Sequence, residues 1–145
     1  MKIGFVGGGI MAEAMLSGIL NQGIAEPLDV CIGEPVEARR QDLEKRYGIK
    51  TTQYNQEATA YGDLLILSIK PQNLPDVLTE LAGSIRKEQV VLSIIAGATL
   101  EAISTGLSHR AVIRVMPNTP AQIGSGMSVW VAAAEVDESF RNTTR

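Results

Sequence analysis

Short runs of apolar residues with high β propensity recur along the chain, and they limit its fold more than any other feature. Most are continuous and do not alternate with polar residues, which is typical of strands buried on both faces of a parallel sheet. The predicted strands are residues 2–6, 28–32, 64–68, 90–94, 111–116 and 127–132, and the predicted helices are residues 11–20, 37–47, 74–82 and 100–107. This alternation predicts an α/β fold with a doubly wound, mostly parallel sheet and helices on both faces.

Composition excludes several classes of protein. The 145 residues, 45% hydrophobic and 20% charged, fit one globular domain with a core of its own. The lone Cys31 excludes an internal disulfide and is expected in the core. A net charge of −3 without basic runs argues against nucleic-acid binding. No apolar stretch approaches the roughly 20 residues of a membrane span, and no secretory signal opens the sequence, so a cytoplasmic location is expected.

A glycine-rich segment follows the first predicted strand and starts the first predicted helix. Its residues are Gly7, Gly8, Gly9, Ile10, Met11 and Ala12, which match the pattern G-x-G-x-x-A. In this pattern the first glycine allows a tight turn, the second lets the backbone approach a pyrophosphate, and the small third residue allows close helix–strand packing. The alternative interpretation is that these glycines only allow a tight turn between strand and helix and bind no ligand. The context within a βαβ unit favours a Rossmann-type dinucleotide site.

An acidic residue is expected about 20 positions after that pattern, where it would bond the adenosine ribose. Glu34 lies there, and its carboxylate would repel the 2′-phosphate of NADP, which favours NAD. Arg39 and Arg40 leave the choice open, because either could hold that phosphate or lie on a solvated helix face. A turn around Glu34 could also swing the carboxylate away.

Two further segments end predicted strands, where open α/β sheets bind ligands. They are Ser68-Ile69-Lys70-Pro71 and Ala96-Gly97. Lys70 could hold a ribose or phosphate, or it could be a strand-end charge reaching solvent.

Conventional catalytic sets are missing from the sequence. The single histidine, His109, lies in a polar stretch and is expected at the surface. Acidic residues such as Glu13 and Glu101 are expected on solvated helix faces. Neither a Ser-His-Asp triad nor a metal cluster is indicated.

The motifs together resemble those of the pyrroline-5-carboxylate reductases. The segments that carry the resemblance are residues 3–15, the I-K-P-Q of residues 69–72, the S-I-I-A-G of residues 93–97 and the R-V-M-P-N-T-P-A of residues 114–121. They run through nearly the whole chain in the order and spacing of that family. The last block is the most specific.

The resemblance implies reduction of 1-pyrroline-5-carboxylate to L-proline with NADPH or NADH. It also implies that residues 1–134 form the cofactor domain and that residues 135–145 begin a linker to a helical domain, which makes the homo-oligomer and carries the substrate segment. The implied cofactor-binding residues are Gly7 to Ala12, Glu34, Asn55, Ser68 to Pro71, Ala96 and Gly97. Asn118 and Thr119 would border the nicotinamide and the substrate, whereas the proton donor to the imine is unassigned.

Three residues depart from the usual pattern of that family. Ile10 replaces a frequent asparagine, Ile95 replaces a small residue, and Glu34 stands where some members place a hydroxyl residue for the NADP phosphate. Two other functions stay open. They are another small-substrate dehydrogenase of similar architecture and a module that senses NAD(P) without chemistry.

Overall fold

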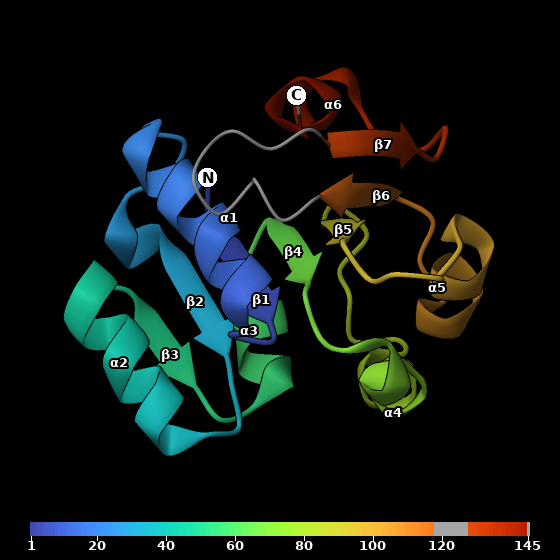
Figure 1. The fold of residues 1–145 in the computed structure, drawn as a ribbon. Coiled ribbons are helices and arrows are strands. Elements are labelled where there is room, and N and C mark those ends of the chain that lie inside the picture. The colour runs from blue at the N-terminus through green and yellow to red at the C-terminus, as the bar shows by residue number, and fades with distance from the viewer. Residues whose placement is uncertain (118–127, 145) are drawn as a thin grey trace.

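The computed structural model describes residues 1–117 and 128–144. Within them the strands form one seven-stranded sheet in the order β3-β2-β1-β4-β5-β6-β7 (Figure 1). The strands are β1 (Ile3–Val6), β2 (Val30–Gly33), β3 (Lys50–Thr52), β4 (Leu64–Leu67), β5 (Val90–Ser93), β6 (Val112–Pro117) and β7 (Ser128–Ala132). All neighbouring pairs are parallel except β6 and β7. The predicted doubly wound, mostly parallel sheet is therefore confirmed.

Helices cover both faces of this sheet. They are α1 (Ile10–Asn21), α2 (Glu37–Tyr47), α3 (Asn55–Tyr61), α4 (Leu74–Leu81), α5 (Leu100–Leu107) and α6 (Glu138–Thr144). Figure 1 shows α1 and α2 on one side, with α4 and α5 on the other. Short 3-10 turns cover Pro27–Asp29 and Pro71–Asn73.

Alternate residues of each central strand enter two separate cores. In β4, Leu64 and Ile66 join the core beneath α1 and α2, while Leu65 and Leu67 join the core beneath α4 and α5. Both faces of β4 are thus buried, which explains why its sequence is a continuous run of apolar residues.

Helix α3 lies against the sheet closely enough to require a glycine beneath it. A Cβ added at Gly4 would lie 2.1 Å from the carbonyl oxygen of Ala58 in α3. The absence of a side chain at Gly4 lets α3 approach β1, and the start of α3 at Asn55 lies against Gly33 at the end of β2.

Several expected boundaries differ from those observed. Residues 28 and 29 belong to a 3-10 turn and not to the second strand, and Leu28 is exposed. Both β3 and α3 were absent from the predicted elements. In the final segment Val136 is buried in the core and residues 138–144 form α6. None of the helices in the described ranges is both long and apolar enough to span a membrane.

Candidate dinucleotide-binding site

The glycine-rich segment turns sharply between β1 and α1. Gly7 has φ +103°, and a Cβ there would lie 2.9 Å from the carbonyl oxygen of Ser68, so both conformation and space require glycine. Gly9 is the N-cap of α1 and makes no side-chain capping bond, and a Cβ on it would meet nothing within 4 Å. No side chain caps the start of α1 and the space beside Gly9 is open, as an anion site requires.

A cleft of about 560 Å³ opens at the carboxyl ends of β1, β2 and β4. It lies where the strand order reverses between β1 and β4, which is the position at which open α/β sheets bind ligands. The cleft is lined by Gly7, Gly8, Gly9, Glu34, Pro35, Val36, Asn55, Ser68, Ile69, Lys70, Asn73, Asp76 and Val77.

The cleft brings together many of the residues expected to bind a cofactor. Those that line it are Gly7, Gly8, Gly9, Glu34, Asn55, Ser68, Ile69 and Lys70. The others do not line it: Ile10 is exposed beside it, Met11 follows in α1, Ala12 is buried, Pro71 begins a 3-10 turn, and Ala96 and Gly97 are exposed after β5. Asn118 and Thr119 lie outside the described residues.

Sequence reasoning missed the cleft residues contributed by the start of α4 and the turn after Glu34. Asp76 and Val77 reach the cleft because α4 begins directly after the 3-10 turn of Pro71–Asn73, which follows the end of β4. The strand end at Ser68 was the available signal, since residues that follow it lie at the same edge of the sheet.

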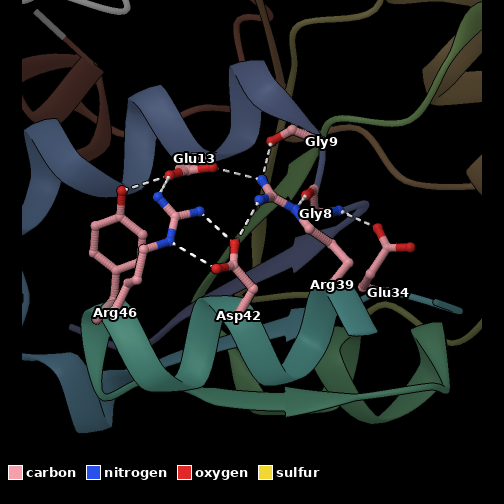
Figure 2. Close-up of polar contacts among 8 residues, drawn as sticks. Gly8, Gly9, Glu13, Glu34, Arg39, Asp42 and Arg46 are labelled. Atoms are coloured by element: carbon pink, nitrogen blue, oxygen red, sulfur yellow. Dashed lines mark hydrogen bonds and ion pairs between the residues drawn. The ribbon is translucent and has the colours of Figure 1, made fainter. Parts of the chain in front are cut away.

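Glu34 is turned toward the glycine-rich segment. Its Oε2 accepts a hydrogen bond of 2.9 Å from the Gly8 N–H (Figure 2). Its Oε1 accepts one of 3.1 Å from the Val36 N–H. The turn at Glu34 therefore does not swing the carboxylate away from the cleft.

Arg39 lies behind the glycine-rich segment. Its Nε donates to the carbonyl oxygen of Gly8 at 2.6 Å, and one terminal nitrogen donates to the carbonyl of Gly9 at 3.3 Å and to Glu13 at 2.7 Å. Its other terminal nitrogen pairs with Asp42 at 3.2 Å. Figure 2 shows this guanidinium between α1 and α2, so Arg39 is not a solvated side chain.

Glu13 corrects another expectation, because it does not lie on a solvated face. Its side chain is only 19% exposed, and its carboxylate accepts hydrogen bonds from Arg39, Arg46 and Tyr47. Burial raises the pKa of Glu13, but the hydrogen bonds from Arg46, Tyr47 and Arg39 outweigh it and bring the pKa to about 2. The carboxylate is thus charged at neutral pH.

His109 was expected at the surface, and that expectation was wrong. It is 8% exposed, and its Nε2 lies 2.8 Å from the carbonyl oxygen of Gln89. The Gln89 side chain in turn donates to the carbonyls of Thr59 and Gly62. Because Gln89 precedes β5, this cluster lies at the amino ends of the strands, away from the cleft.

Cys31 is buried in β2, as expected from the sequence. Burial raises the pKa of its thiol, and the charge of Glu57 raises it further. Across residues 1–117 and 128–144, no three His, Cys, Asp or Glu side chains are grouped to hold a metal ion.

Known proteins resemble this chain in sequence and in fold. The model of the family described as "NADP oxidoreductase coenzyme F420-dependent" matches residues 2–97. The chain is 41% identical over 137 residues to a pyrroline-5-carboxylate reductase of Synechocystis, covering 94% of this chain and 51% of that protein. It is 36% identical over 128 residues to the Escherichia coli enzyme of that name, covering 88% and 48%.

A solved pyrroline-5-carboxylate reductase from Coxiella burnetii superposes with a TM-score of 0.90 at 28% identity, over 99% of this chain and 53% of that one. The chain spans about half the length of the curated relatives it matches. The family match nevertheless covers more than half of this chain. The chain therefore belongs to the NADP oxidoreductase family described as coenzyme F420-dependent, and its predicted resemblance to the pyrroline-5-carboxylate reductases is confirmed.

Proposed function

We propose that this chain is the cofactor-binding part of a pyrroline-5-carboxylate reductase, which reduces the cyclic imine to L-proline with NAD(P)H. The observation that carries the proposal is the cleft at the β1–β4 switch point, where the glycine-rich segment and Glu34 meet. Curated relatives of that name align over 88% and 94% of this chain.

The shape and polarity of the cleft suit a dinucleotide. The open space around Gly9 leaves room for a pyrophosphate against the first turn of α1. Glu34 presents a carboxylate to accept hydrogen bonds from ribose hydroxyls. Asn55, Ser68, Ile69 and Lys70 form the rest of the wall, while Ala96 and Gly97 extend the same sheet edge at the end of β5.

When bound, the nicotinamide supplies the hydride that the imine carbon accepts. The chain's own contribution is positioning, since Gly7 fixes the turn and Gly8 and Gly9 admit the nucleotide backbone. By resemblance to the reductases, Asn118 and Thr119 would border the substrate.

The complete enzyme would pair residues 1–134 with a helical domain, toward which residues 135–145 lead. That domain would supply the homo-oligomer and the substrate-binding segment, and the enzyme would work in the cytoplasm. Consistent with this division, the relatives are about twice as long as the chain.

The test joins the whole chain, residues 1–145, to the helical half of the Escherichia coli relative and assays the chimera for proline formation from 1-pyrroline-5-carboxylate. The unfused chain should bind NAD(P)H and form little or no proline, whereas the chimera should form it. A chimera that folds and binds NAD(P)H but reduces no imine would refute the proposed substrate. Proline formation by the unfused chain would refute the division into two parts.

A further inference from the structure

The β2 end of the cleft presents a fixed negative charge. Two backbone N–H groups, of Gly8 and Val36, hold the Glu34 carboxylate by one oxygen each. A Cβ on Gly8 would lie 3.2 Å from Glu34 Oε2, so the carboxylate lies directly against the glycine-rich segment. Figure 2 shows it on the side of Gly8 opposite to Glu13.

The cations nearest to Glu34 in sequence are already engaged. Arg39 is held by two carbonyl oxygens of the glycine-rich segment and by the carboxylates of Glu13 and Asp42. Arg40 donates to the carbonyl oxygens of Glu34 and Pro35 at 2.8 and 3.0 Å. Neither guanidinium lines the cleft as described.

The remaining charges of the cleft do not compensate for Glu34. Among its described lining residues, Asp76 adds a second carboxylate and Lys70 is the only lysine or arginine. Lys70 follows β4, and β1 separates β4 from β2, so Lys70 lies across the glycine-rich segment from Glu34.

We infer that this chain selects NADH over NADPH, with Glu34 as the residue that sets the preference and Glu13 keeping Arg39 from the extra phosphate. The inference rests on the proposed function, and it departs from the NADP in the family description. A ribose 2′-hydroxyl would donate to the Glu34 carboxylate. A 2′-phosphate, with a charge of about −1.5 to −2, would instead lie beside the Glu34 carboxylate and be repelled by it. Arg39 and Arg40 are engaged elsewhere and would not neutralise this repulsion.

Direct binding measures this preference without catalysis. We would titrate the chain with NADH and with NADPH by calorimetry at low ionic strength. NADH should bind at least about tenfold more tightly, and the ratio should narrow as salt is added, because salt screens the repulsion. Glu34→Gln should reduce the ratio to below about threefold, chiefly by strengthening NADPH binding.

Two further variants serve as controls. Glu34→Asp keeps the charge and should keep the preference for NADH. Glu37→Gln removes the same charge from an exposed residue three positions later, outside the described cleft lining, and should change neither affinity. Circular dichroism would confirm that each variant is folded.

Each outcome bears on a different claim. Equal binding of the two nucleotides, or tighter binding of NADPH, by the unmodified chain would overturn the inference while supporting the proposed cofactor site. A folded Glu34→Gln variant with an unchanged ratio would overturn the role of Glu34. Binding of neither nucleotide would refute the proposed function and the inference together.

Discussion

Replacement of Glu13 by glutamine tests how strongly α1 and α2 are joined by charge. In the folded chain the carboxylate accepts hydrogen bonds from Arg39, Arg46 and Tyr47 (Figure 2). Glutamine keeps the size and one acceptor oxygen but loses both ion pairs. We therefore expect Glu13→Gln to lower the free energy of unfolding.

The pKa of Glu13 sets the upper limit of the effect. The difference between the ordinary value of 4.5 and the folded value of about 2 corresponds to at most about 3.4 kcal/mol. Arg46 is 44% exposed, so solvent screens part of the interaction. We expect a loss of about 1–2 kcal/mol, which would lower Tm by about 3–8 °C.

The pH dependence separates a charge effect from a packing effect. Because the folded pKa is depressed, the stabilisation by Glu13 is complete above the unfolded value near 4.5 and disappears as pH falls toward 2. The difference between the unmodified chain and Glu13→Gln should therefore be largest at about pH 7 and much smaller at about pH 3.

Urea unfolding at about pH 7 and about pH 3, followed by the fluorescence of the single tryptophan, Trp130, measures the loss of stability and its pH dependence. Glu88→Gln, which removes a charge from an exposed residue before β5, is the matched control and should change stability by less than about 0.5 kcal/mol. Equal stability of Glu13→Gln and the unmodified chain at neutral pH would refute the reasoning. A difference that is the same at both pH values would also refute it.

Three other predictions concern single positions. Gly9→Ala should change the free energy of unfolding by less than about 1 kcal/mol, because the new Cβ meets nothing within 4 Å. Calorimetry should nevertheless show at least about tenfold weaker NADH binding by this variant. Gly4→Ala should lose about 3 kcal/mol or more in urea unfolding, since the new Cβ would lie 2.1 Å from the Ala58 carbonyl, and a loss below about 1 kcal/mol would contradict the packing of α3. Cys31 should resist iodoacetamide in the folded chain and react in urea, because burial raises the pKa of its thiol; rapid labelling of the folded chain would contradict its burial.

The fold was predictable from sequence wherever burial was complete. The continuous apolar runs predicted β4 and β5. A charged segment with a narrow apolar stripe, which ends before Gly48, predicted α2 over its observed range. By contrast, β3 is a polar edge strand, Lys50–Thr52, with no apolar signal. Helix α3 was missed because its sequence, NQEATAY, lacks an apolar stripe and packs instead through small residues against Gly4.

The site was predictable where its chemistry is local. The glycine-rich segment and Glu34 follow strand ends that the sequence identifies, and the cleft is lined by Glu34 and by the three glycines of that segment. The role of Glu13 was hidden because its partners Arg39 and Arg46 lie 26 and 33 residues away. His109 was misplaced for the same reason, since its partner Gln89 is 20 residues distant.

The position of Arg39 has a consequence for the electrical character of the glycine-rich segment. Its guanidinium holds the carbonyl oxygens of Gly8 and Gly9 from behind. In a planar trans peptide the N–H points opposite to the C=O, so the N–H groups of Gly9 and Ile10 are directed away from the guanidinium. Arg39 thereby fixes the orientation of two peptide dipoles whose positive ends face outward, and this half-buried cation would favour a bound phosphate without touching it.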